Sequence, residues 1–392
     1  MWSSDEMTVL RGFEKPTGFH DLPPQLVRKK RRIEDRVRMV FENWGYEEVL
    51  TPALEFAETV GKASAISEQK MFKCIDRQGN TLVLRPDLTA PIARMTASVL
   101  KNEPLPLRLS YHASVFRAQE NEAGRNAEFY QSGVELIGNA SSTADAEVIA
   151  LAVEALQNCQ IDSFQLAIGH EALLDGLLRE CIRNESSIQK LKEQLSQRNM
   201  VGFWEALQEL DINYQAKKEL LYLFQLRSCK EQLTSVRKLS ETTQVLKAAD
   251  QLEEVWRQLE VYGIDHYCVL DFGLIGRIGY YTGVYFEGYS SSLGFPLLSG
   301  GRYDSLLTCF HRNLPATGFA LDVNRMMEVS QLECEKRERF VICYTDHLYE
   351  KAIKKAVALR KQGKVVVLDQ ISKPSETSKE TILSDSHVIW IV

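Results

Sequence analysis

The chain has 392 residues, of which 44% are hydrophobic and 26% are charged, and its formal net charge is −6 at pH 7. This composition is typical of a globular protein with two or three domains, and no apolar run is long enough to span a bilayer. The polar, acidic start of the chain lacks the pattern of a secretion signal, so we expect a cytoplasmic protein with no membrane partner. The acidic balance also argues against a nucleic-acid-binding protein.

The eight cysteines and seven histidines are scattered along the chain. No Cys-x-x-Cys pair and no histidine cluster has the spacing of zinc ligands. Small buried hydrophobes in a reducing compartment explain the cysteines best. The sequence therefore assigns no residue to a metal or a cofactor.

The first part of the chain predicts helices and strands in alternation. Val27–Trp44 has helical periodicity and ends at Gly45. Met71–Ile75 and Thr81–Leu84 have the pattern of a hairpin. The other predicted elements are the strands Tyr46–Leu50, Leu107–Phe116 and Glu128–Leu136, the helix Ala144–Asn158 and the strand Ser163–Ile168.

From Glu171 to about Val261 the sequence changes character, because Leu, Glu, Lys and Gln dominate and proline is absent. Helical periodicity repeats through this stretch, which predicts a helical insertion. Strand patterns then return at His266–Asp271, Tyr280–Phe286 and Thr317–Val323. Between the last two strands, Ser299-Gly300-Gly301 predicts a turn before a helix that starts near Tyr303, and Asn324–Ser330 predicts another helix.

A charged linker at Glu333–Arg339 precedes a small tail. The tail predicts a βαβ-like unit, made of Phe340–Tyr344, a helix over His347–Gln362, Val365–Leu368 and Val388–Val392. The whole pattern predicts an α+β protein: a mostly antiparallel sheet with flanking helices, a helical insertion and a short α/β C-terminal tail. Composition and pattern alone do not name its function.

An ordered set of short motifs is more informative. The motifs are Gly18-Phe19-His20-Asp21-Leu22-Pro23-Pro24, Leu84-Arg85-Pro86-Asp87-Leu88-Thr89, Val115-Phe116-Arg117, Phe129–Glu135, Tyr280–Gly283, Gly300–Asp304 and Gly318–Arg325. Each is weak alone, but their order resembles the catalytic core of histidyl-tRNA synthetase, a class II aminoacyl-tRNA synthetase fold. The resemblance implies a synthetase-like core at 1–170 and 262–332, a helical insertion at 171–261, and a remnant of the anticodon-binding domain at 339–392.

The resemblance also implies roles for single residues. Pro52 matches the motif 1 proline at the dimer interface of the core, which implies a homodimer. Arg117 matches the motif 2 arginine that grips the α-phosphate of ATP, and Arg325 matches the motif 3 arginine that faces the outer phosphates. The residues that match the histidine site are Asp87, Thr89, Gln131, Glu135, Tyr280 and Tyr281. A carboxylate and a hydroxyl there could hold an α-ammonium, while Glu135 and a tyrosine hydroxyl reach an imidazole.

Several departures from the synthetase pattern bear on catalysis. Amino-acid activation needs preorganised cations aimed at the reacting phosphorus. One of them is the arginine of an Arg-Gly-Leu-Asp-Tyr-Tyr segment, whose position here is Gly276. Gly279 replaces the aspartate, and Arg277 is displaced by one residue, which on a strand turns its side chain to the opposite face. The sequence therefore argues against catalysis.

Motifs 2 and 3 also differ from the synthetase pattern in ways that argue against catalysis. Gln119, Glu120 and Ala127 stand where the synthetase pattern has a glutamate and two arginines. In motif 3, Asp322 and Asn324 replace a glycine and a glutamate. A basic loop has become acidic, which should weaken the binding of ATP and tRNA phosphates.

These departures together resemble the regulatory subunits of ATP phosphoribosyltransferase, which have lost aminoacylation. Such chains pair with a short-form catalytic subunit that joins ATP to phosphoribosyl pyrophosphate in the first step of histidine biosynthesis. The resemblance implies a non-catalytic chain within a hetero-oligomer and feedback inhibition by histidine as the effector. The acidic loop argues against tRNA as a ligand.

Two other functions stay open from the sequence. The chain could be a divergent but active histidyl-tRNA synthetase, or a module that senses histidine or uncharged tRNA. The residues that match the histidine site could also be a vestigial polar pocket retained for folding, since inheritance of a fold does not establish a working site.

Overall fold

The computed structural model describes residues 14–64, 66–118, 126–225, 227–228, 233–276, 279, 281–333, 338–371 and 386–391. The chain forms two compact units, Met1–Leu332 and Glu333–Val392. Within the described residues, no helix is both long and apolar enough to cross a membrane. The division of the first unit into a core and an insertion stays a prediction.

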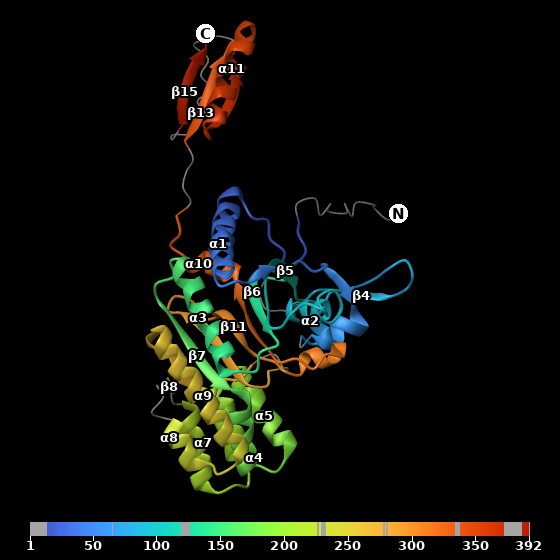
Figure 1. Ribbon diagram of the computed structural model, residues 1–392, viewed down its shortest axis with the longest axis vertical. Helices are drawn as coiled ribbons and strands as arrows, with labels where there is room; N and C mark the ends of the chain where they lie inside the picture. The colour runs from blue at the N-terminus through green and yellow to red at the C-terminus, as the bar shows by residue number, and fades with distance from the viewer. Residues whose placement is uncertain are drawn as a thin grey trace, which may run out of the picture. The chain divides into compact units, whose positions relative to one another are not determined.

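A nine-stranded sheet forms the centre of the first unit (Figure 1). Its spatial order is β1 (Glu47–Glu48), β5 (Leu107–Phe116), β6 (Glu128–Ile137), β12 (Ala316–Asp322), β11 (Pro296–Arg302), β10 (Val284–Ser290), β7 (Phe164–His170), β9 (Cys268–Asp271) and β8 (Arg227–Ser228). The β1–β5 and β7–β9 pairs are parallel and all other pairs of this sheet are antiparallel. The expectation of a mostly antiparallel sheet is confirmed.

Helices cover the apolar face of this sheet. They include α1 (Pro24–Asn43), α3 (Ser142–Asn158), α9 (Thr243–Tyr262) and α10 (Val323–Val329). In α1, Ile33, Val37 and Phe41 recur at helical spacing and are fully buried, and the helix ends before Gly45, whose φ of +78° suits glycine. Contacts join α3 to both α1 and α9 (Figure 1). On the opposite face, a second apolar cluster that includes Leu109, Tyr111 and Phe129 borders a polar region, named the polar face below.

One row of residues across the sheet defines that polar face. Glu135 of β6 lies opposite Gly318 of β12, Gly318 lies opposite Gly301 of β11, and Gly301 lies opposite Tyr285 of β10. Directly opposed residues of antiparallel strands share one face. A Cβ atom on Gly318 would lie 2.1 Å from Oε2 of Glu135, so the space above the glycines exists only because they have no side chains.

A small second sheet and a helix border the polar face. The sheet has the order β2 (Leu54–Phe56), β4 (Thr81–Leu84) and β3 (Lys73–Ile75), all antiparallel. The predicted hairpin is thus confirmed, with Asp76 accepting backbone and side-chain hydrogen bonds from Asn80 in its turn. The helix α2 (Thr89–Ser98) follows β4 along the chain.

The stretch predicted as a helical insertion is helical in the structure. After β7 come α4 (Glu171–Cys181), α5 (Glu185–Ser196), α6 (Met200–Gln208), α7 (Tyr214–Gln225) and α8 (Leu233–Leu239), and then α9. Asn184 and Asn199 cap α5 and α6 by accepting hydrogen bonds from first-turn amides. The two-residue strand β8 was not predicted; it pairs with β9 at the edge of the main sheet.

Two local predictions were wrong. Ser299-Gly300-Gly301 is not a turn but part of strand β11, because these glycines admit neighbouring backbone: a Cβ on Gly300 would lie 2.4 Å from the carbonyl oxygen of Gly318. The helix predicted near Tyr303 is a short 3-10 turn, Leu306–Phe310. The other predicted elements are present with shifted ends; the largest shifts shorten Tyr46–Leu50 to β1 and start β10 at Val284.

The second unit is a three-stranded parallel sheet with one helix. The sheet order is β14 (Val365–Gln370), β13 (Arg339–Tyr344) and β15 (Ser386–Ile391), and α11 (Tyr349–Lys361) connects β13 to β14. Ile342, Ala352 and Ala356 form its fully buried centre. The predicted βαβ arrangement is confirmed. Of the linker predicted at Glu333–Arg339, residues 334–337 lie outside the described part of the chain.

Candidate functional site

Glu135 is the central polar group on the glycine-lined face of the sheet. The residue is 2% exposed, and its two carboxyl oxygens accept hydrogen bonds from different elements. Oγ1 of Thr89, the first residue of α2, donates to Oε1 at 2.8 Å, and the hydroxyl of Tyr303 donates to Oε2. Burial raises the pKa of Glu135 to about 8, and the nearby charge of Asp87 acts in the same direction. Glu135 can thus exchange a proton near neutral pH.

Asp87 lies at the start of α2, beside Glu135. Its Oδ1 accepts a hydrogen bond from the amide of Ala90 at 3.0 Å, and its Oδ2 accepts one from the hydroxyl of Ser64. The first of these bonds satisfies an amide that has no partner within the helix. Asp87 is 6% exposed, so a buried negative charge is held by the chain at the edge of the site.

A small pocket of about 70 Å³ brings most of the predicted histidine-site residues together. Asp87, Thr89, Gln131, Glu135 and Tyr281 all line it. Tyr280, the remaining predicted residue, lies outside the described part of the chain. The volume is that of about two water molecules, so the pocket alone admits part of a small polar ligand and not a whole nucleotide.

Sequence reasoning missed three polar residues that line the same pocket. Tyr303 donates to Glu135, Tyr111 is fully buried beside it, and Ser299 lies on β11. Tyr303 belongs to the Gly300–Asp304 motif, which by its pattern predicts a turn and the start of a helix and not a site residue. Its position directly after a strand that faces Glu135 is the signal that could have identified it.

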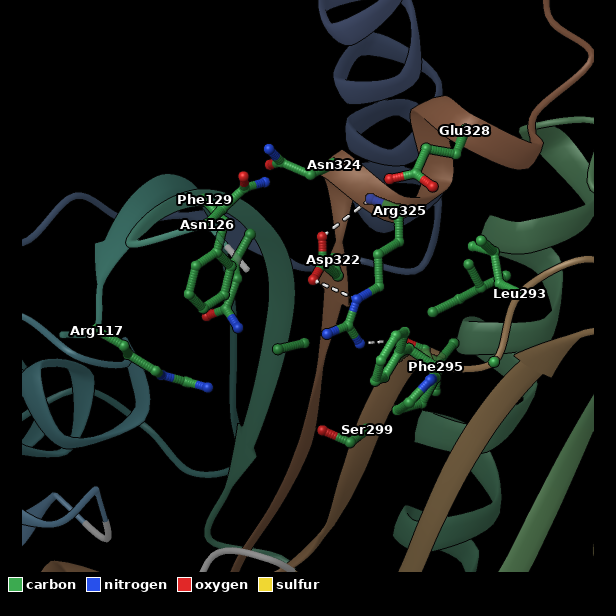
Figure 2. A pocket seen from close by; sticks show the side chains of 16 residues that line it. Arg117, Asn126, Phe129, Leu293, Phe295, Ser299, Asp322, Asn324, Arg325 and Glu328 are labelled. Atoms are coloured by element: carbon green, nitrogen blue, oxygen red, sulfur yellow. Dashed lines mark hydrogen bonds and ion pairs between the residues drawn. The ribbon is translucent and has the colours of Figure 1, made fainter. Parts of the chain in front are cut away.

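A larger cavity of about 450 Å³ adjoins the pocket and shares Arg117, Gln131, Ser299 and Ala320 with it. Both arginines that match nucleotide-binding positions line this cavity (Figure 2). Other lining residues, drawn in the figure, include Asn126, Phe129, Phe295, Asp322, Asn324 and Glu328.

Arg325 is held by its own surroundings. Its Nε lies 3.1 Å from Oδ2 of Asp322, and one terminal nitrogen donates to the carbonyl oxygen of Pro296 at 2.5 Å. Its guanidinium also lies over the ring of Phe295, 5.4 Å from the centroid. Figure 2 shows the side chain directed towards Asp322 and Phe295. The charge of Arg325 is therefore compensated within the chain.

Asp322 has a second task, because its Oδ1 accepts a hydrogen bond from the Arg325 amide at 3.0 Å and caps α10. Burial raises the pKa of Asp322, while the charges of Arg325 and Arg117 act against that rise. A glycine at this position, as in the synthetase pattern, could provide neither the cap nor the counter-charge.

Arg117 approaches the cavity from the side opposite to Arg325 (Figure 2). Its Nε donates to the carbonyl oxygen of Pro86 at 2.8 Å, and its guanidinium lies 5.0 Å from the ring centroid of Phe129. Pro86 directly precedes Asp87, so Arg117 links the large cavity to the small pocket.

The structure also explains two of the departures from the synthetase pattern. Ala127 is 2% exposed and its amide donates to the carbonyl oxygen of Gly18 at 2.7 Å, so the Gly18–Pro24 motif packs where the pattern has an arginine. The side-chain oxygen of Asn324 accepts a hydrogen bond from the amide of Tyr130 at 2.8 Å. Gln119, Glu120 and Arg277 lie outside the described residues. No group of three or more His, Cys, Asp or Glu side chains in the described part of the chain could hold a metal ion.

Comparison with known proteins is consistent with this architecture. A sequence model of the family "Histidyl-tRNA synthetase" matches residues 18–326. A solved histidyl-tRNA synthetase from Nostoc sp. PCC 7120 has a TM-score of 0.77 at 20% identity and covers 93% of this chain and 87% of its own, which shows a shared fold. The sheet and its pocket therefore define a histidyl-tRNA synthetase-like protein with a class II fold.

More similar relatives carry a narrower name. Proteins named ATP phosphoribosyltransferase regulatory subunit from Bacillus licheniformis and Shouchella clausii are 42% and 43% identical to this chain, over 92% and 97% of it and over 92% and 96% of their own lengths. A solved ATP phosphoribosyltransferase regulatory subunit/histidyl-tRNA synthetase from Bacillus halodurans has a TM-score of 0.88 at 40% identity, covering 97% of this chain and 98% of that one. The chain belongs to the family of ATP phosphoribosyltransferase regulatory subunits.

Proposed function

We propose that this chain is the non-catalytic subunit of an ATP phosphoribosyltransferase, and that a short-form partner chain carries the activity that begins histidine biosynthesis. Family membership supports the regulatory role. We further propose that the chain binds histidine in the Glu135 pocket and transmits feedback inhibition to the partner.

The ion pair between Asp322 and Arg325 carries the proposal that the chain is not a synthetase. Catalysis of adenylate formation needs cations that are aimed at phosphate and not already neutralised. Here the nitrogen of Arg325 lies 3.1 Å from a carboxylate oxygen of its own chain. With Glu328 also lining the cavity, two arginines face two acidic residues. A bound triphosphate would therefore meet little net positive charge, and we interpret Arg117 and Arg325 as a vestigial nucleotide site.

The small pocket, in contrast to the large cavity, supports the binding of its proposed ligand, histidine. Binding of a small amino acid needs hydrogen-bond partners and not a set of free cations. Glu135, with hydroxyl partners on both oxygens, offers a carboxyl whose proton state can adapt to an imidazole. Asp87 supplies a negative charge for an α-ammonium, with Gln131 and Tyr281 at the rim. We propose these residues, together with Thr89 and Tyr280, as the histidine site.

A homodimer of this chain forms part of the proposal. Leu50, Leu54 and Phe56, which flank Pro52, are 78%, 44% and 47% exposed. Exposed apolar side chains gathered on one short stretch are typical of an interface. Leu50→Asp should shift the chain towards monomer in sedimentation analysis, whereas Val261→Asp, at a site that is 76% exposed in α9, should leave the dimer unchanged.

Co-expression with a short-form catalytic subunit tests the central proposal. Gel filtration should show a complex, and phosphoribosyl transfer should depend on this chain and fall when histidine is added. The isolated chain should show no histidine-dependent exchange of pyrophosphate into ATP. Robust exchange would instead identify an active histidyl-tRNA synthetase, and salt-sensitive tRNA binding without exchange would favour a tRNA-sensing module.

A further inference from the structure

A buried ionic network joins the insertion to the main sheet at some distance from Glu135. Arg198 lies between α5 and α6 in a left-handed conformation, with φ of +58°. Its guanidinium reaches Oδ2 of Asp271 at 3.3 Å and Oε2 of Glu287 at 2.9 Å. It also donates to the hydroxyl of Tyr289 at 3.0 Å. One insertion residue thus contacts β9 and β10 together.

The carboxylates of this network are buried on the sheet. Asp271 and Glu287 are each 3% exposed, whereas the Arg198 side chain is 30% exposed. Removal of the cation from a buried carboxylate strongly destabilises the folded protein. The position of the insertion therefore affects the electrostatic state of this part of the sheet, because Arg198 supplies a cation to both carboxylates.

The network continues towards the pocket through two tyrosines. The hydroxyl of Tyr285 donates to Oε1 of Glu287 at 2.6 Å. The ring of Tyr285 contacts the ring of Tyr281, with centroids 4.6 Å apart. Tyr281 in turn lines the Glu135 pocket. It packs both against the apolar cluster that contains Tyr303 and against the cluster that contains Tyr285.

Strand register places Tyr285 and Glu287 on the same face of the sheet as Glu135. Tyr285 lies in the same row as Glu135, separated from it only by Gly301 and Gly318. In the next row Glu287 lies opposite Ser299, which lines the pocket. A Cβ on Gly301 would lie 3.1 Å from the ring of Tyr281. The ring therefore occupies the space above Gly301 and lines the same pocket as Glu135, where a bound ligand would meet it.

We infer that Arg198 and Glu287 are positioning residues for the pocket, and that ligand binding at Glu135 and docking of the insertion are coupled through Tyr285 and Tyr281. This inference rests on the proposed histidine pocket and adds its regulation. Coupling between two sites is reciprocal, so a ligand that fixes Tyr281 tightens the insertion, and a docked insertion raises ligand affinity. The insertion would thereby report occupancy of the pocket to a partner.

The first arm of the test uses the full chain and L-histidine. Amide hydrogen exchange is measured over residues 195–208, with calorimetry on the same samples. L-Histidine should slow exchange there about fivefold. Tyr285→Phe keeps the ring but removes the hydroxyl that reaches Glu287, and should abolish most of this protection. Tyr222→Phe, at a tyrosine in α7 that is 60% exposed, serves as the matched control, with the protection retained.

A second arm needs no ligand. Tyr281→Leu removes the ring that contacts Tyr285 and should speed exchange over 195–208 about fivefold. Phe310→Leu, which removes a ring that packs against the cluster containing Tyr303 but does not line the pocket, should leave that exchange unchanged. Arg198→Lys keeps the positive charge but cannot contact Asp271 and Glu287 with two separate nitrogens of a guanidinium. Its exchange rate should be intermediate, whereas a folding defect would speed exchange throughout the chain.

The outcomes separate the two proposals. If histidine binds with measurable heat but exchange over 195–208 does not respond, the coupling is wrong and the pocket stands. If histidine does not bind but Tyr281→Leu accelerates exchange, the link from Tyr281 to the insertion stands and the histidine pocket is wrong. Unchanged exchange in Tyr281→Leu overturns the coupling whatever histidine does.

Discussion

The small pocket and the large cavity lie side by side on one sheet but differ in how their polar groups are used. In the pocket, Glu135 accepts hydrogen bonds from hydroxyls that a ligand can join or replace. In the cavity, Arg325 is bound to a carboxylate and a carbonyl of its own chain. The two regions share Arg117 and Gln131, so their difference is local.

This difference shows how a fold can keep one ligand and lose another. A triphosphate is held by uncompensated cations, and one new carboxylate nearby is enough to weaken that attraction. A small amino acid is held by hydrogen bonds of several kinds, which survive the change. One site can therefore lose its catalytic activity and still bind an amino acid.

The largest effect is expected from Glu135→Ala. Removal of the buried carboxyl leaves the hydroxyls of Thr89 and Tyr303, and the imidazole of a ligand, without their shared partner. Histidine affinity should fall about 100-fold in calorimetry of the complex with the catalytic partner. Glu328→Ala, which removes a carboxyl from the large cavity instead, should change it little. Equal affinity in the wild type and Glu135→Ala would sink the pocket proposal.

Gly318→Ala tests the space that makes the pocket possible. The added Cβ would lie 2.1 Å from Oε2 of Glu135 and 2.3 Å from the carbonyl oxygen of Val134. Because Val134 O belongs to the backbone of β6, it cannot move aside easily, and we expect a loss of about 2 kcal/mol in the free energy of unfolding. Gly294→Ala lines the large cavity where a Cβ meets nothing within 4 Å. Its urea midpoint should match that of the wild type; equal losses in both variants would contradict the packing argument.

Asp322→Gly should partly reverse the loss in the large cavity. Removal of the carboxylate releases Arg325 from its counter-charge, so ATP affinity in equilibrium dialysis should rise about tenfold. Glu328→Gln removes one charge from the same cavity without releasing Arg325 and should give a smaller rise. If both variants gain equally, net charge and not the ion pair limits nucleotide binding.

The sequence predicted the parts of this site whose signal is local. Asp87, Thr89, Gln131 and Glu135 lie in motifs, and β6, the strand that carries the last two, follows from its residue pattern. Tyr111 and Ser299 carry no such signal, because they reach the pocket only through the pairing of β5 with β6 and of β11 with β12. Strand register is a property of the assembled sheet and cannot be read from one strand.

The wrong interpretation of Ser299-Gly300-Gly301 has the same origin. Paired glycines usually indicate a turn, but here each one makes room for an atom of a neighbouring strand: Gly318 O beside Gly300 and Val284 O beside Gly301. The ion pair of Asp322 with Arg325 was within reach of the sequence, since an aspartate three residues before an arginine at a helix start can both cap and pair. The network around Arg198 was not, because its members are far apart along the chain.

The smallest effect concerns stability and pH. Burial raises the folded-state pKa of Glu135 to about 8, from the usual value of 4.5 in an exposed glutamate, so the folded chain holds a proton that the unfolded chain releases. Its contribution to stability is complete below about pH 4.5 and is lost as pH rises through about 8.

The side chain introduced by Glu135→Gln cannot ionise, so this variant should not lose stability as the pH rises. By differential scanning calorimetry, the Tm of the variant relative to the wild type should rise by about 3 °C between pH 6 and pH 9. Glu328→Gln, at an exposed carboxyl, should show no such trend. A Tm difference for Glu135→Gln that is flat with pH would mean that Glu135 is already charged in the folded chain at pH 6. Histidine would then meet a fixed carboxylate in the pocket and not a carboxyl that adapts to its imidazole.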